Sequence, residues 1–290
     1  MANLKDIRRR ISSVKNTQQI TKAMKMIAAV KLRKAQDQIL AARPYAQELI
    51  SVIANLALHG ETKYHPLLVR RKIKNGRVFV VTSDRGQCGG YNANIIRQTE
   101  HFLKEKKETF QDLKVCFIGK KGYEYFNKKL DEKRVGHYYE GVMGEPHFEH
   151  ALKIADELMD EYTQAKLDHV FFVYNEFKSA MNQHVVVETL LPVRAKAEEQ
   201  ALSKVDYLYE PSKKDVLSAL LPKHIRIQVY RILLEASSSE HGARMTAMDN
   251  ASKNAAEMID KLTLIANRVR QAAITTELME IVGGAEALKA

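Results

Sequence analysis

Residues 4–30 read LKDIRRRISSVKNTQQITKAMKMIAAV, and the whole stretch from 4 to 58 contains no glycine and a single proline, Pro44. A repeat near 3.5 residues over several heptads is typical of a long helix with a narrow apolar seam. Because proline lacks a backbone N–H, we expect Pro44 to kink or divide this helix. Uncharged, mostly apolar side chains mark the seam at steps of three and four residues: Leu4, Ile7, Ile11, Val14, Gln18, Thr21, Met24, Ala28, Leu32, Ala35 and Ile39.

The C-terminal part of the chain repeats this pattern. Ser212 followed three residues later by Asp215 is a capping box, which predicts that a helix begins there. Pro222 predicts a kink or a short separate helix near this start. Two long helices with narrow seams are expected to wind around each other as an antiparallel coiled coil, with two helices of an ordinary bundle as the alternative. The second seam comprises Val229, Ile232, Leu233, Ala236, Met248, Ala251, Ala255, Ile259, Leu262, Ala266, Val269, Ala273, Thr276 and Met279.

The middle of the chain alternates short β-rich runs with amphipathic helical stretches, which is typical of an α/β domain. The predicted fold class is therefore α/β, in which a long antiparallel coiled coil of N- and C-terminal helices carries an inserted Rossmann-like α/β domain. We expect the N-terminal helix in 1–60, the inserted domain with its flanking joints in 61–211, and the C-terminal helix in 212–290. The predicted strands are 77–82, 114–118, 135–139, 170–174 and 184–191, and the predicted helices are 92–107, 123–127 and 148–165.

Composition and charge restrict the class of protein. The 290 residues are 45% hydrophobic and 28% charged, as expected for a globular protein, and no apolar run has the length needed to span a membrane. Two cysteines in separate segments imply no disulfide framework. The net charge of +11 is uneven, because residues 1–60 hold 11 Lys and Arg against 3 Asp and Glu. Such a basic helix could meet nucleic acid, an anionic membrane surface or an acidic protein.

The candidate chemical motifs point to structural roles. Residues 83–90, SDRGQCGG, follow the first predicted strand, yet they match no phosphate-binding fingerprint, so we interpret them as a strand-to-helix turn. Cys88 and Cys116 are interpreted as packing residues. The group His147, Glu149 and His150 lacks a recognised zinc spacing and is interpreted as a solvated helix start. We therefore predict no catalytic residue, no cofactor and no metal site, and no enzyme activity of the chain by itself.

Of the three possible partners of the basic helix, an acidic protein fits best. Residues 1–60 contain one aromatic, Tyr45, and their basic side chains fall around the whole helix. Nucleic-acid surfaces usually carry aromatic platforms and a basic stripe. Helices that lie on membranes use bulky aromatic anchors, which this seam of Ala, Met and Ile lacks. A basic coiled-coil protein that binds nucleic acid or acts as a scaffold remains the alternative.

Several motifs resemble one protein family. Residues 4–11 (LKDIRRRI) and 16–29 (NTQQITKAMKMIAA) closely resemble the N-terminal helix of the gamma subunit of F-type ATP synthase. The C-terminal stretches 243–248 (ARMTAM) and 270–285 (RQAAITTELMEIVGGA) resemble the same family's C-terminal signature. The segments 83–90 (SDRGQCGG) and 206–211 (DYLYEP) are similar to its middle motifs, in the same order along the chain. The resemblance covers the whole chain.

The resemblance implies a rotor shaft. In this family the terminal helices form a coiled coil inside a ring of three alpha and three beta subunits, and the α/β domain lies outside, near epsilon and the c-ring. Rotation of the shaft then couples proton flow through the membrane sector to ATP synthesis or hydrolysis on beta. By its motifs the resemblance implies beta-subunit contacts at Arg85, Arg270 and Gln271, a coupling cluster of Met24, Arg244, Gln271, Thr275 and Glu277, and a foot at Tyr207 that meets the c-ring and epsilon.

The resemblance also implies a location. Neither the dithiol insertion of the chloroplast version nor a mitochondrial transit peptide is expected from the sequence. We therefore expect a bacterial protein on the cytoplasmic side of the plasma membrane, peripheral to it, with membrane contact only through the complex and with no nucleic-acid partner.

Overall fold

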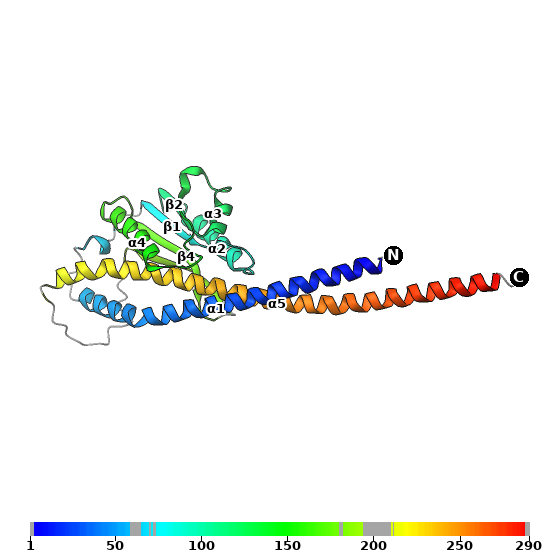
Figure 1. Cartoon of the computed structure of the whole chain (residues 1–290). Helices are drawn as coiled ribbons and strands as arrows, with labels where there is room; N and C mark the ends of the chain where they lie inside the picture. The colour runs from blue at the N-terminus through cyan, green and yellow to red at the C-terminus, as the bar shows by residue number, and fades with distance from the viewer. Residues whose placement is uncertain are drawn as a thin grey trace. The chain divides into compact units, whose positions relative to one another are not determined.

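The computed structural model describes residues 3–58, 65–69, 71, 74–179, 182–193, 210 and 212–287. The chain divides into two compact units, each described here by itself. One consists of Met1–Ile27 with Met245–Ala290, and the other is Ala28–Arg244 (Figure 1). None of the helices in the described ranges combines the length and the apolar composition needed to cross a membrane.

Two long helices contribute to both units. Helix α1 comprises Leu4–Leu58 and helix α5 comprises Lys213–Ala287. Pro44 and Pro222 lie inside them, and the helices continue through both positions. The first helix is therefore not divided at Pro44 and no short separate helix forms near Pro222, whereas a kink at either proline, the other expectation, stays a prediction.

Exposure explains why these prolines are tolerated. A proline has no backbone N–H to donate to the carbonyl four residues earlier. This carbonyl belongs to Leu40 for Pro44 and to Ser218 for Pro222. Leu40 is 57% exposed, and Pro44 and Ser218 are also exposed. Water can hydrogen-bond to a carbonyl that lies on such a surface.

The predicted start of the C-terminal helix is confirmed. The backbone N–H of Asp215 donates to Ser212 Oγ at 3.2 Å, as in a capping box. The Ser212 hydroxyl in turn donates to Asp215 Oδ2 at 2.7 Å. The predicted cap is therefore formed at the start of α5.

In the unit of Met1–Ile27 and Met245–Ala290, the two helical segments lie side by side and run in opposite directions (Figure 1). Lys25 Nζ lies 2.5 Å from Asp249 Oδ1 and links them. Their antiparallel pairing agrees with the sequence analysis, whereas their winding as a coiled coil stays a prediction. Buried seam residues of this unit are Ile7, Thr21, Met248, Ala255 and Ala266.

The unit Ala28–Arg244 contains one five-stranded sheet among its described residues, in the order β3-β2-β1-β4-β5. Strands β1 to β4 are parallel, and β5 runs antiparallel to β4. Each predicted strand and connecting helix is present, so the predicted α/β class is confirmed. The strands are β1 Asn75–Val81, β2 Asp112–Ile118, β3 Val135–Tyr139, β4 His169–Phe177 and β5 Gln183–Leu191, and the helices are α2 Tyr91–Glu105, α3 Lys120–Phe126 and α4 Phe148–Thr163.

Both faces of the sheet are covered by apolar side chains. Along β1, Val78 and Val80 pack in one cluster with α2, while Phe79 and Val81 pack in the other with α4 and α5. This alternation follows from the two-residue period of a strand. Phe79 stacks on Phe172 of β4 with ring centroids 4.7 Å apart. Parallel sheets are normally buried on both faces in this way, which explains the near-continuous apolar runs of the sequence.

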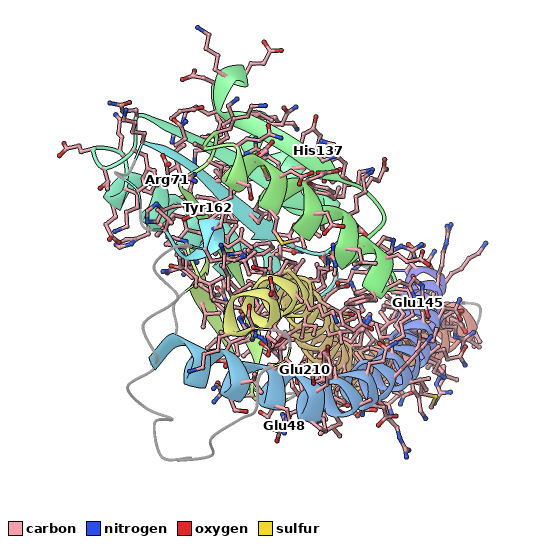
Figure 2. All side chains as sticks on the ribbon, turned by 90° about the vertical axis from the view of Figure 1, so that its left-hand side faces the viewer. Glu48, Arg71, His137, Glu145, Tyr162 and Glu210 are labelled. Carbon is pink, nitrogen blue, oxygen red and sulfur yellow. The ribbon has the colours of Figure 1, made fainter. Side chains whose placement is uncertain are left out.

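Helix α5 lies between α4 and α1 in this unit (Figures 1 and 2). Its apolar residues, among them Leu221 and Val229, share one core with Leu49 and Ile53 of α1. The part of α5 in this unit is therefore surrounded by other elements and is not a free helix.

The segment before β1 is attached to α4. The guanidinium of Arg71 lies over the Tyr162 ring at 5.1 Å and donates to the Tyr162 carbonyl at 2.6 Å, and the two residues lie together in Figure 2. The Tyr162 hydroxyl donates to the Val69 carbonyl at 2.7 Å. These contacts fix the entry to the first strand.

An ion-pair network connects α5 to the sheet. Arg231 donates to Glu188 of β5 at 2.6 Å, to Glu235 at 2.9 Å and to the hydroxyl of Tyr174 of β4 at 3.2 Å. Tyr174 itself donates to Glu188 at 2.6 Å. Charge-assisted bonds of this kind are short and directional, so they set the position of α5 across β4 and β5.

Candidate functional site

The turn of residues 83–90 joins β1 to α2 and is stabilised by its own side chains. Ser83 is fully buried, and its hydroxyl donates to the Arg85 carbonyl at 2.6 Å. Asn92 accepts a hydrogen bond from the Ser83 N–H at 3.0 Å and donates to Ser83 Oγ at 2.7 Å. The predicted strand-to-helix turn is confirmed, and it leaves the Arg85 side chain exposed.

The loop after β2 is tied to this turn. Asp84 Oδ1 accepts a hydrogen bond from the Lys120 N–H at 3.1 Å, and the Thr82 hydroxyl accepts one from the Gly122 N–H at 2.8 Å. Backbone N–H groups at this edge of an α/β sheet bind phosphate in nucleotide-binding proteins. Here the chain's own oxygens occupy these two donors.

A polar segment of α5 contacts the start of α2 and strand β4. The Tyr91 hydroxyl donates to the Ala236 carbonyl at 3.1 Å, and the Ser239 hydroxyl donates to the Asn175 carbonyl at 2.9 Å. The apolar seam predicted from the sequence stops at Ala236 and resumes at Met248, and no role was predicted for the residues directly after Ala236. The residues that follow Ala236 are polar and at most 5% exposed: Ser237, Ser238, Ser239, Glu240 and His241.

Arg244 connects α5 to the turn. Its Nη1 lies 2.6 Å from Glu240 Oε1, and its Nη2 donates to the carbonyls of Arg85 at 3.4 Å and Gly86 at 3.3 Å. The side chains of Arg244 and Glu240 are 14% and 6% exposed. The structure thus brings together two residues, Arg85 and Arg244, that the sequence analysis named for separate reasons. Glu240 was missed, although its position one helical turn before an arginine is a recognisable pairing signal.

Burial dominates the electrostatics of this site. Burial raises the pKa of Glu240, while the neighbouring Arg244 guanidinium opposes that shift. Burial likewise raises the pKa of the Cys88 thiol, which is 2% exposed. The pKa of His241 is lowered to about 4, first by burial and then by the charges of Arg244 and Lys31. His241 is therefore neutral at neutral pH, which avoids a further cation beside Arg244.

The other cysteine and the histidine group have structural surroundings. Cys116 is 1% exposed inside β2, and burial raises its pKa to about 11. It is a packing residue, as predicted. His150 Nδ1 accepts a hydrogen bond from the His147 N–H at 3.1 Å at the start of α4. The His147 group therefore caps a helix. The described residues contain no group of three or more His, Cys, Asp or Glu that could hold a metal ion.

The remaining predicted site residues lie mainly on the last part of α5. Arg270, Gln271, Thr275 and Glu277 are exposed. Thr275 Oγ1 donates to the Gln271 carbonyl at 3.0 Å, so these two residues lie one helical turn apart. The same segment exposes large apolar side chains, with exposed fractions from 49% to 69%: Ile274, Leu278, Met279, Ile281 and Val282. Such a surface is typical of a protein interface.

Two of the predicted site residues, Met24 and Tyr207, take no part in the contacts described above. Met24 is half-buried on α1 in the unit of Met1–Ile27, whereas Arg244 belongs to the other unit. Tyr207, with most of its motif, lies outside the described residues. The contacts unite Arg85 with Arg244, and Gln271 with Thr275.

Comparison with known proteins identifies the family. A family model described as ATP synthase matches residues 3–288. The ATP synthase gamma chain of Geobacter sp. (strain M21) is 52% identical over 290 residues, covering 100% of both chains. The chain belongs to the ATP synthase gamma-chain family. The resemblance found in the motifs is therefore confirmed, and with it the expected function of a gamma subunit, the central stalk of F-type ATP synthase.

Solved structures agree with this family assignment. A chain of the central stalk and c-ring structure of Tetrahymena thermophila mitochondrial ATP synthase has a TM-score of 0.57 at 26% identity, covering 80% of this chain and 99% of that one. A chain of the Euglena gracilis mitochondrial ATP synthase structure of OSCP, F1 and c-ring has a TM-score of 0.65 at 19% identity, covering 98% and 94%. The second likeness supports the fold.

Proposed function

We propose that this chain is the rotor shaft that couples ion flow through the membrane sector, and the c-ring rotation it drives, to ATP synthesis or hydrolysis on the beta subunits. The observation that carries the proposal is the full-length match to an ATP synthase gamma chain at 52% identity. The exposed apolar and polar surface of α5 supports it, because such a surface suits a helix that works inside a sleeve of other subunits.

The proposed partners are the alpha and beta subunits of the ring, epsilon and the c-ring. The neighbouring structures of a central stalk with c-ring, and of F1 with c-ring, support this set. One asymmetric shaft presents a different face to each of three identical beta subunits. Each orientation therefore shifts the conformational equilibrium of each beta subunit differently, and the shaft itself needs no catalytic residue or cofactor.

The residue roles are part of the same proposal. Exposed Arg85, Arg270 and Gln271 contact beta subunits, and their exposure leaves them available for such contacts. The set Met24, Arg244, Gln271, Thr275 and Glu277 governs coupling, and Tyr207 belongs to the foot that meets epsilon and the c-ring. Complementary charge between the basic N-terminal helix and acidic beta-subunit loops favours the correct register.

The division into parts and the location follow from this role. We assign the shaft to 1–60 and 212–290, and the inserted α/β domain with its joints to 61–211. As a member of the gamma-chain family, the protein is part of a membrane-associated complex. Its bacterial relatives support a finer placement at the plasma membrane, peripheral and on the cytoplasmic side.

Reconstitution tests the proposal. The chain is mixed with matched alpha and beta subunits, the complex is isolated by size, and ATP hydrolysis is measured together with rotation of a bead on the shaft. The bead is attached through Lys107→Cys, because Lys107 is exposed on the inserted domain. The two native cysteines, Cys88 and Cys116, are only 2% and 1% exposed, so they would not compete for the label. Stepped, one-way rotation supports the proposal.

The same reconstitution can also overturn the proposal. A folded chain that forms no complex with competent partners would overturn the rotor role. Filter binding to RNA and duplex DNA over a salt series then decides the alternative, since phosphate contacts give a steep salt dependence.

A further inference from the structure

The backbone of the turn 83–90 is supported from outside the turn. Gln87 has a φ of 65°, a left-handed backbone conformation that residues other than glycine rarely adopt. Such a conformation costs free energy, and it persists only where contacts with neighbouring residues hold the backbone in place. The carbonyls of Arg85 and Gly86, just before Gln87, both accept hydrogen bonds from Arg244. Arg244 therefore supports the part of the turn that carries the exposed Arg85 side chain.

Arg244 is itself oriented by Glu240. The two residues lie one helical turn apart on α5, and their charged groups are 2.6 Å apart. Both side chains are largely shielded from water, so a guanidinium that lost this carboxylate would keep its charge without its charge-assisted bond. The long, flexible side chain of Arg244 would then be held only by the two carbonyls and by His241 Nδ1, which lies 3.4 Å from Nη1, and it would point less accurately at the carbonyls.

Stability alone is a poor explanation for Glu240. Buried ion pairs often stabilise a fold no better than apolar residues of the same volume. One oxygen of Glu240, Oε2, also has no hydrogen-bond partner among the described residues, which adds to the cost of burial. Glu235 Oε2 carries the same cost, so what distinguishes Glu240 is the arginine that it orients. Arg244 reaches the carbonyls of the turn 83–90, whereas the arginine paired with Glu235 contacts the sheet.

We propose that Glu240 is a positioning residue for rotary coupling, which orients Arg244 and through it the turn 83–90, so that Arg85 is presented to a beta subunit. This inference rests on the proposed function, because it assumes the contact of Arg85 with beta. It assigns no direct contact with a partner to Glu240, which is 5% exposed.

The chain offers a matched control on the same helix. Arg231 and Glu235 form another ion pair one helical turn apart, at 2.9 Å, with Glu235 15% exposed as a side chain. Arg231 contacts β4 and β5 of the sheet, at Tyr174 and Glu188. Glu235→Gln therefore removes a comparable charge at a comparable depth and does not act on Arg85.

The test is a double-mutant cycle in the complete complex in membrane vesicles. Proton pumping per ATP hydrolysed is measured for Glu240→Gln, Arg85→Ala, the double variant and Glu235→Gln. We expect each of the first two to lower this ratio by roughly fivefold, at the low end of coupling between sites. The double variant should be no worse than Arg85→Ala alone, because both changes act through one contact. Glu235→Gln should lower the melting temperature and leave the ratio unchanged.

Each opposite outcome has its own meaning. If Arg85→Ala lowers the ratio and Glu240→Gln does not, or if their effects multiply in the double variant, the positioning role is overturned. If Arg85→Ala itself leaves the ratio unchanged, the proposed beta contact of Arg85 fails instead. If Glu240→Gln does not assemble, Glu240→Asp replaces it in the cycle, since it keeps the charge with a shorter reach, and the same outcomes decide.

Discussion

The buried ring of His241 makes the stability of the fold depend on pH. Its pKa is lowered to about 4, while an unfolded histidine titrates near 6.5. Below pH 6.5 the unfolded state binds a proton that the folded state excludes, so stability is lost as the pH falls toward 4, by about 1.4 kcal/mol per pH unit. His224 has the same sign, because burial lowers its pKa to about 4 as well.

We predict that His241→Gln reduces the loss of stability between pH 6.5 and pH 4. Urea midpoints of the full-length chain between pH 7 and pH 4.5 should fall less steeply in the variant, with the remaining slope due partly to His224. His101→Gln is the control, because His101 is exposed on α2. Parallel curves for the parent chain and His241→Gln would contradict the prediction.

Gly119 is a second position where one residue decides local structure. Its φ is +95°, and an added Cβ would lie 1.9 Å from the Thr82 carbonyl oxygen. We predict that Gly119→Ala costs at least ~2 kcal/mol in the free energy of unfolding, since a positive φ and a backbone clash coincide. Gly86→Ala serves as the control, because nothing lies within 4 Å of its added Cβ. Denaturation of both variants in urea measures the difference, and equal losses would show that the close approach is relieved at little cost.

At the scale of elements, the attachment of α5 to the sheet depends on Arg231. Arg231→Ala leaves Glu188 and Glu235 without their cation. Because Arg231 and Glu188 are only half-buried, at 29% and 34% exposed, we predict a loss of about 1.5–3 kcal/mol, as for hydrogen bonds to charged groups. Arg226→Ala on the same helix breaks a more exposed pair with Asp156, for which we expect less than about 1 kcal/mol. Thermal and urea unfolding of the two variants compares them, and similar losses would mean that the network is not what attaches α5.

The elements themselves were largely predictable. Strand β3 was predicted with the residues that it has, and β1, β2, β4 and β5 differ from prediction by a few residues at their ends. The central strands β1, β2 and β4 could be recognised because they are mostly apolar and buried, and the edge strands β3 and β5 because they contain β-branched or aromatic residues. The effect of Pro44 and Pro222 was not predictable, since it depends on whether water or protein surrounds the carbonyl that loses its partner.

At the scale of the whole molecule, the exposed end of α5 should transmit torque. We predict that Arg270→Ala or Gln271→Ala lowers proton pumping per ATP hydrolysed by roughly fivefold, while ATP hydrolysis persists. The reason is that each substitution removes a proposed polar contact that must form again at every step. Arg268→Ala is the control, an equally charged and exposed side chain outside the predicted contact set. An unchanged ratio for both Arg270→Ala and Gln271→Ala would count against the proposed beta contacts.

The sequence by itself determined the two long helices, the α/β alternation between them, the family, and the exposed candidates on α5. These features are local or periodic. A helical spacing of three and four residues, or a strand spacing of two, can be recognised without knowing what packs against the segment. Only the tertiary structure decided that α5 carries a buried polar segment, that Arg231 bridges two strands, and that Arg244, paired with Glu240, contacts a turn about 160 residues earlier. The physical reason is that such pairs depend on which surfaces meet when the sheet is covered. A helix's own sequence records its apolar face, whereas the partner of a polar group on that face is set by the rest of the fold.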